Sequence, residues 1–215
     1  MGPVMVGPSS SHTAGAVRIG RVARRLLGSL PVSADIQLHG SFAATGTGHG
    51  TDRAIVAGLL DMAPDDPAIP QSLRLAQEAA MALSIRKVEL RDAHPNTALL
   101  SLTNAQGRTL VVNASSLGGG RIRVNAIDGM DASFSGSLPT LIIRNEDKPG
   151  IVAEVAQTLS GHGANIATMQ LYRDRRGGLA VMVIECDHPL SSGLLTRVSE
   201  LDGVVRCTYL DMEGA

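Results

Sequence analysis

The chain has 215 residues, of which 44% are hydrophobic, 18% charged and 2% aromatic, and its formal net charge at pH 7 is −1. This apolar content is enough for packed cores, and the length allows two small domains. The balanced charge and the scarcity of aromatic side chains argue against nucleic-acid binding. No apolar run reaches the roughly 18 residues that a membrane span requires, so we expect a cytoplasmic protein that does not bind membranes.

The chain has only two cysteines, Cys186 and Cys207. They stand far apart in the sequence and form no Cys-x-x-Cys pair, whereas disulfide frameworks and iron–sulfur sites use several cysteines at short spacing. We therefore expect no disulfide framework and no metal site within this chain.

The first half of the chain predicts a mixture of helices and strands. A helix should follow Thr13, because apolar residues recur at helical spacing and Gly28 is suited to end it. The residues of that apolar stripe are Ile19, Val22, Ala23, Leu26 and Leu27. Further helices are predicted over 51–60 and 71–83, and strands over 34–38, 86–91, 97–103, 108–114 and 121–127, with a hairpin turn at 104–107.

Small and polar residues dominate 131–139, which indicates a linker between domains over 1–132 and 138–215. After the linker the pattern predicts a strand, a helix, two strands, a helix and a last strand. These segments are 141–144, a helix from Ile151, 164–171, 179–185, 192–201 and 204–210. This βαββαβ order is that of a ferredoxin-like domain, so the predicted fold class is α+β.

A hydroxyl-rich segment precedes the first helix and reads Gly7-Pro8-Ser9-Ser10-Ser11-His12-Thr13. Buried hydroxyls need hydrogen-bond partners, and the free N–H groups of a helix N-terminus attract anions. The segment could therefore hold a small carboxylate. On helix logic alone, Ser11 or Thr13 could equally be an N-cap with the other side chains in solvent.

A second polar segment, from His39 to Asp52, leaves a strand, turns through several glycines and enters a helix. Such junctions are common ligand sites. A phosphate-binding loop is not expected, because no Gly-Lys-Ser/Thr sequence closes the segment and the dinucleotide-binding spacing is absent. His49 stands near Thr51 and Asp52, which could orient it as a base, although a lone loop histidine can also be a solvated surface group.

Together, the two segments closely resemble the signature of iron–sulfur-dependent L-serine dehydratases. The matching runs are Gly7 to Gly15, His39-Gly40-Ser41 and Thr45-Gly46-Thr47-Gly48-His49-Gly50-Thr51-Asp52. Since an ACT-like sequence follows them, the chain resembles the separate beta chain of the two-chain type, over essentially its whole length. The resemblance implies a first domain of α/β type, similar to the allosteric substrate-binding domain of phosphoglycerate dehydrogenase.

The resemblance also implies a chemistry. Members of this family convert L-serine to pyruvate and ammonia, and an alpha subunit holds the [4Fe-4S] iron–sulfur cluster that binds the substrate hydroxyl, so this chain would be inactive alone. His49 would be the general base, with His12 as the competing candidate. Asp52 would either contact the substrate or cap its helix. The other implied substrate-binding residues are Ser9, Ser10, Ser11, Thr13 and Thr51.

Two runs in the second domain resemble the ACT signature, Asp147-Lys148-Pro149-Gly150 and Gly163-Ala164-Asn165-Ile166. ACT domains usually dimerise and bind amino acids at the interface, which implies a homodimer with L-serine or another amino acid as ligand. The implied ligand-binding residues are Asn145, Asp147, Gly150, Ile151 and Asn165. Serine-binding ACT domains would have His and Asn in place of Asn145 and Asp147, and an acidic Asp147 would disfavour a carboxylate. A dimerising scaffold without a ligand is the alternative.

Two further functions remain open on the residues alone. A non-catalytic amino-acid sensor would use the same two domains without an alpha subunit. A metal site built from His12, His39 and His49 is the weakest reading, because these residues lack the i, i+4 spacing of helical zinc motifs.

Overall fold

The computed structural model describes residues 10–45 and 50–212, except the side chains of Ser10, Ser11 and Thr45. The chain divides into two compact units, Met1–Asp128 and Gly129–Ala215. No helix in the described part of the chain is long and apolar enough to cross a membrane.

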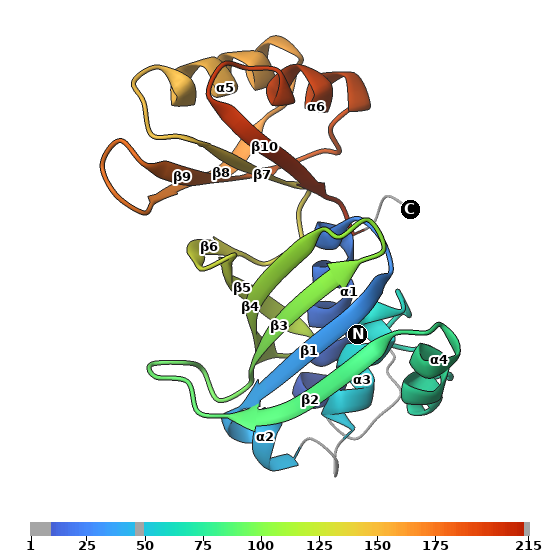
Figure 1. The fold of residues 1–215 in the computed structure, drawn as a ribbon. Helices are drawn as coiled ribbons and strands as arrows, with labels where there is room; N and C mark the ends of the chain where they lie inside the picture. The colour runs from blue at the N-terminus through green and yellow to red at the C-terminus, as the bar shows by residue number, and fades with distance from the viewer. Residues whose placement is uncertain (1–9, 46–49, 213–215) are drawn as a thin grey trace. The chain divides into compact units, whose positions relative to one another are not determined.

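Unit 1 is a sheet with helices packed on one face (Figure 1). Its strands are hydrogen-bonded in the order β2-β1-β3-β4-β5. Strands β1 and β2 are parallel, and the other neighbours are antiparallel. Its elements are η1 (Ser10–Gly15), α1 (Ala16–Leu27), β1 (Pro31–His39), α2 (Gly40–Thr45), α3 (Thr51–Leu59), η2 (Ile69–Gln71), α4 (Ser72–Glu78), β2 (Ala82–Val88), β3 (Thr97–Asn104), β4 (Thr109–Gly118) and β5 (Arg121–Ile127).

Helix α1 confirms the predicted apolar stripe. All of its members are buried, namely Ile19, Val22, Ala23, Leu26 and Leu27. Gly28 ends the helix in the left-handed conformation, with φ of 91°, and its N–H donates to Arg24 O. A residue with a side chain rarely adopts this φ, which is why glycine stands at the helix end.

Helices α1 and α3 approach each other through two glycines. A Cβ atom at Gly20 would lie 2.2 Å from Ile55 O, and one at Gly58 would lie 2.1 Å from Val17 O. Both distances are far below van der Waals contact, so no larger residue fits without moving the helices apart.

The segment from Gly40 to Thr45 is helical, although the glycine-rich sequence predicted a loop there. Two contacts explain this short helix. Phe42 is fully buried, and the backbone N–H of Ser41 donates to Pro95 O at 2.8 Å. Tertiary packing therefore decides the local conformation.

The predicted helix over 71–83 is too long, and the predicted strand over 86–91 begins too late. Helix α4 ends at Glu78, and Ala80 has a left-handed φ of 56°. Strand β2 starts at Ala82 because it pairs in parallel with β1, from Ser33 opposite Ala82 to His39 opposite Val88. Pairing to a distant strand overrides the helical propensity of this alanine-rich segment.

Unit 2 contains the predicted βαββαβ order (Figure 1). Its sheet has the antiparallel order β10-β7-β9-β8, and α5 and α6 cover one face. Its elements are β6 (Met130–Phe134), β7 (Thr140–Glu146), α5 (Ile151–Gly161), β8 (Ile166–Arg173), β9 (Leu179–Cys186), α6 (Ser192–Ser199) and β10 (Val204–Leu210). The core between sheet and helices is built from aliphatic side chains such as Leu141, Ile143, Val155, Leu159 and Ile184.

The stretch expected to be a linker contains strand β6. Ala132 and Phe134 are buried on one side of this strand, and β6 contacts β8 and β9 within unit 2. The unit boundary lies before β6, between Asp128 and Gly129. The serines around β6 masked this short alternation of apolar residues in the sequence.

Candidate functional site

Helix α1 runs alongside β4 in the opposite direction. Arg108, just before β4, donates from Nη2 to Leu26 O at the far end of α1, at 2.6 Å. Arg18, in the first turn of α1, donates from Nη1 to Gly120 O just after β4, at 3.2 Å. The short helix η1, which precedes α1, therefore lies at the carboxyl end of β4 and packs against that strand.

Helix α3 also contacts η1 at this end of unit 1. The C-terminal ends of α1 and α3 are joined, because Arg24 Nη1 donates to Leu59 O at 3.1 Å and Arg25 pairs with Asp61 at 3.1 Å. The two helices cross at Gly20 and Gly58, which places α3 against the first half of α1. Contacts between α3 and η1 agree with this placement.

His12 connects the two polar segments of the sequence. Its Nε2 atom lies 3.1 Å from Ser41 Oγ, and its ring meets the ring of Phe42 edge-on, with centroids 5.5 Å apart. Strands β1 and β4 are both antiparallel to β3, so they end at the same edge of the sheet. The site thus lies at the carboxyl ends of β1 and β4, where ligands commonly bind in α/β sheets. Ser41 was not predicted as a site residue, although its place after Gly40 in the motif was a usable signal.

Thr13 and Thr51 are the clearest sign of a ligand site. Their exposed fractions are 4% and 0%, and neither Oγ1 atom has a hydrogen-bond partner among the described residues. Leaving a buried hydroxyl unpaired costs about 1–3 kcal/mol, so folded proteins contain few of them. Thr13 lies in a π-helical turn, a local structure frequently found at functional sites. Two such hydroxyls on contacting elements indicate a position that a polar ligand can fill.

The N-terminus of α3 supplies further hydrogen-bond donors. Gly50 precedes the helix in a left-handed conformation with φ of 69°. Asp52 turns its carboxylate back onto the helix, where Oδ1 accepts the N–H of Arg53 at 2.8 Å. The Asp52 carboxylate is therefore engaged by the first turn of its own helix. The other first-turn N–H groups and the helix dipole favour an anion at this end.

Part of the predicted site lies outside the described residues. Ser9 and His49 fall there entirely, and the side chains of Ser10 and Ser11 do so as well. Of the predicted set, His12 and Thr13 lie in η1, which contacts α3, the helix that begins with Thr51 and Asp52.

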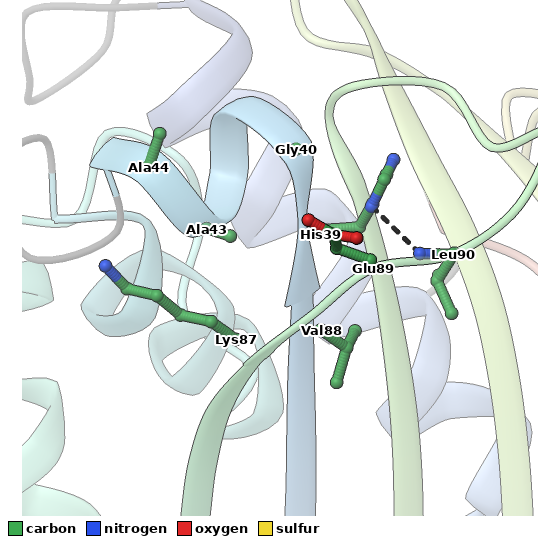
Figure 2. Close-up of a pocket in the computed structure, with 8 residues that line it drawn as sticks. All are labelled: His39, Gly40, Ala43, Ala44, Lys87, Val88, Glu89 and Leu90. Atoms are coloured by element: carbon green, nitrogen blue, oxygen red, sulfur yellow. Dashed lines mark hydrogen bonds between the residues drawn. The ribbon is translucent and has the colours of Figure 1, made fainter.

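A cavity of about 520 Å³ opens beside this site, at the carboxyl ends of the parallel strands β1 and β2 (Figure 2). It is lined by His39, Gly40, Ala43, Ala44, Lys87, Val88, Glu89 and Leu90. Figure 2 shows the Lys87 and Glu89 side chains extending to different sides. His39 Nδ1 accepts the N–H of Leu90 at 3.1 Å, which fixes the orientation of the ring.

The described residues contain no group of three or more histidine, cysteine or acidic side chains arranged to hold a metal ion. His12 and His39 contact Ser41 and Leu90, respectively. The two cysteines do not fit an iron–sulfur cluster either. Cys186 is buried in the core of unit 2, where burial raises the pKa of its thiol, and burial raises the pKa of the Cys207 thiol to about 11. A cluster needs thiolates, which these surroundings disfavour.

In unit 2, Asp147 holds the turn between β8 and β9. Its Oδ2 atom accepts the N–H of Gly177 at 2.9 Å and a hydrogen bond from Arg173 Nη1 at 3.3 Å. The Gly177 N–H, with help from the Arg173 charge, holds the pKa of the Asp147 carboxyl below its usual value. The neighbouring Asn145 is fully buried, with its Nδ2 donating to Glu146 O and its Oδ1 unpaired among the described residues.

The remaining predicted ACT residues do not form one pocket within a single unit. Asn165 precedes β8, where its Nδ2 donates to Asp187, whereas Asp147 lies level with the other end of β8. Gly150 starts α5 with a left-handed φ of 94°. The Ile151 side chain packs in the core, so only its backbone can reach a ligand at the helix start.

Known proteins match both units. Residues 3–80 match the family described as serine dehydratase beta chain, and residues 139–203 match the ACT domain. The chain is 26% identical to a D-3-phosphoglycerate dehydrogenase of Archaeoglobus fulgidus over 200 residues, which are 92% of this chain and 37% of that protein. This match agrees with the expected likeness to part of phosphoglycerate dehydrogenase.

Two relatives match over almost their whole length. The chain is 39% identical to the "Probable L-serine dehydratase, beta chain" of Bacillus subtilis, over 98% of this chain and 95% of that protein. It is 34% identical to the "L-serine dehydratase, beta chain" of Peptoniphilus asaccharolyticus, over 99% of this chain and 96% of that protein. With hydroxyl-lined helix N-termini in unit 1 and an ACT fold in unit 2, the chain belongs to the beta-chain family of L-serine dehydratases.

Proposed function

We propose that unit 1 binds L-serine at the carboxyl ends of β1 and β4, as the substrate-binding part of a two-chain L-serine dehydratase. The observation that carries this proposal is the pair of buried, unpaired hydroxyls of Thr13 and Thr51. Serine has a carboxylate that hydroxyl and backbone N–H donors can bind. The first turn of α3 adds those N–H groups, and its dipole favours the negative charge.

The reaction needs a base and an acceptor for the leaving hydroxyl. A base removes the α-proton, the β-hydroxyl leaves as water, and the resulting aminoacrylate tautomerises and is hydrolysed to pyruvate and ammonia. We assign the base to His49, which stands two residues before Thr51 in the sequence. His12 is assigned to positioning, because Ser41 and Phe42 engage its ring.

The iron–sulfur cluster belongs to the alpha chain in this proposal. A [4Fe-4S] cluster there would supply the Lewis acid that helps the hydroxyl to leave. The two beta-chain cysteines are disfavoured as ligands by burial and raised pKa, which supports this division. The isolated beta chain would accordingly produce no pyruvate.

The deciding experiment is anaerobic reconstitution of the chain with its alpha chain, assayed for pyruvate formed from L-serine. We expect activity only in the assembled pair. His49→Ala should abolish turnover while the cluster absorbance is retained. Near-normal turnover of that variant would remove His49 as the base, and L-serine binding without any dehydration by the pair would favour an amino-acid sensor instead.

For unit 2 we propose a homodimer that binds L-serine or another amino acid between two ACT domains. Strand β8 is an edge strand, and Asn145 and Arg173 both lie opposite Ala180. Antiparallel pairing of two β8 strands about a twofold axis would bring Asn165 of one copy beside Asp147 and Arg173 of the other. The separated ACT residues would then meet across the interface.

Sedimentation and calorimetric titration with L-serine test the unit 2 proposal. Leu171→Arg, on the exposed side of β8, should produce monomers that bind no amino acid at this interface. Asn165→Ala should weaken binding and leave the dimer intact. A chain that is monomeric before any substitution would contradict the proposal.

A further inference from the structure

Two neighbouring serines at the end of β4 have opposite surroundings. Ser115 Oγ contacts Thr97 Oγ1 at 2.7 Å and accepts a hydrogen bond from Asn125 Nδ2 at 2.8 Å. Ser116 is fully buried, with an exposed fraction of 0%, and its Oγ has no partner among the described residues. Adjacent strand residues point to opposite faces, so only Ser115 belongs to the polar network on its side of the sheet.

Ser116 lies on the helix-facing side of β4. The buried residues Leu110, Val112 and Ala114 alternate along the strand, and Ser116 is the next position on that face. Helix η1 packs against β4, and the Arg18 contact to Gly120 places η1 at this end of the strand. Helix η1, which carries Thr13, therefore lies at the end of β4 and also contacts α3.

The backbone around Ser116 is fixed, which leaves only its hydroxyl unsatisfied. Its N–H donates to Asn96 O at 2.9 Å. Gly118, Gly119 and Gly120 follow with left-handed φ values of 91°, 60° and 73°, and they turn the chain tightly into β5. Side chains would be strained at these φ values, which is why glycines form this turn.

We propose that Ser116 is a third hydroxyl of the serine site and donates a hydrogen bond to the carboxylate of the bound amino acid. The inference rests on the function proposed above for Thr13 and Thr51. All three hydroxyls are buried and unpaired, and they come from three elements that meet around η1. A carboxylate accepts several hydrogen bonds, so one anion can satisfy hydroxyls that no protein group satisfies.

The matched pair Ser116→Ala and Ser115→Ala tests the proposal in the assembled two-chain enzyme. Ser116→Ala should raise the KM for L-serine about tenfold, as expected for the loss of a hydrogen bond to a charged group. Its melting temperature without substrate should stay equal or rise, because the variant removes an unpaired buried hydroxyl. Ser115→Ala should do the opposite: it lowers the melting temperature, since Thr97 and Asn125 lose a partner, and leaves the KM unchanged.

The outcomes separate this inference from the proposed function. If the unsubstituted pair forms pyruvate and Ser116→Ala keeps its KM within about twofold, Ser116 does not bind the substrate. A clear fall in the melting temperature of Ser116→Ala, together with an unchanged KM, would mean that its hydroxyl serves the fold. If the unsubstituted pair forms no pyruvate from L-serine, the proposed function fails and this inference fails with it.

Discussion

The Nε2 atom of His12 lies 3.1 Å from the Oγ atom of Ser41. This contact connects the hydroxyl-rich segment before α1 to the second polar segment, which begins at His39. The two residues come from η1 and α2, which flank the carboxyl end of β1. A hydrogen bond of this kind fixes the direction of an imidazole ring more than it stabilises the whole fold.

Ser41→Ala should therefore affect activity more than stability. We expect kcat/KM for L-serine to fall about tenfold, because the His12 ring loses one fixed contact, while the free energy of unfolding changes by about 1 kcal/mol or less. Steady-state assays and urea denaturation measure the two effects. Ser33→Ala, at an exposed position of strand β1, which precedes α2, is the control and should change neither. Equal loss of activity in both variants would contradict the role given to Ser41.

Gly20→Ala and Gly58→Ala should each destabilise the protein by about 3 kcal/mol, because the added methyl group meets backbone atoms of the opposing helix. Thermal denaturation of the full chain is the measurement. Gly193→Ala in α6 is the control, since a Cβ there meets nothing within 4 Å. If the helix variants melt at the temperature of the control, the close crossing of α1 and α3 is wrong.

Asp147→Asn should destabilise unit 2 at neutral pH but not in acid. The pKa of Asp147 in the folded chain is lowered, chiefly by the Gly177 N–H, so the ionised carboxylate stabilises the fold above its unfolded pKa of about 3.9. This stabilisation is lost as the pH falls through the folded-state pKa. Urea denaturation at several pH values should show the variant and the unsubstituted chain converging below about pH 4. Asp65→Asn, at an exposed position, should show no such convergence because it starts with no difference.

The double variant Cys186→Ala, Cys207→Ala should leave the iron and sulfide content of the assembled enzyme unchanged. Both thiols have raised pKa values and are disfavoured as cluster ligands. Substitution in the core of unit 2 should cost about 1–2 kcal/mol of stability. Elemental analysis after reconstitution checks this. Loss of iron from a folded, assembled double variant would place a cluster ligand in this chain.

Secondary structure could be predicted from the sequence where the apolar residues recur with a single clear period. The stripe of α1 and the βαββαβ order of unit 2 were predicted because helical and alternating periods repeat over several turns or strands. Helix α2 and the start of β2 were missed, since each depends on a distant partner. Pro95 holds the first turn of α2, and β1 recruits Ala82 into the sheet.

The candidate site was predictable in composition but not in arrangement. Glycines, hydroxyls and histidines at strand–helix junctions identified Thr13 and Thr51, and the structure adds that both are buried and unpaired. Ser116 could not be singled out, because the sequence shows two identical serines and only pairing across the sheet distinguishes them. The separation of Asn165 from Asp147 likewise follows from strand direction, which a local motif does not contain.

The crossing at Gly20 and Gly58 has a consequence for ligand binding. The close contact of α1 and α3 at these glycines limits the distance between η1 and α3. These two elements carry Thr13 and Thr51, whose hydroxyls are proposed to bind the same anion. The width of the binding site is thus determined by backbone contact several residues away, at positions that never touch a ligand. A slightly larger side chain at Gly20 or Gly58 would therefore increase the distance between the elements that carry Thr13 and Thr51 before it unfolds the protein.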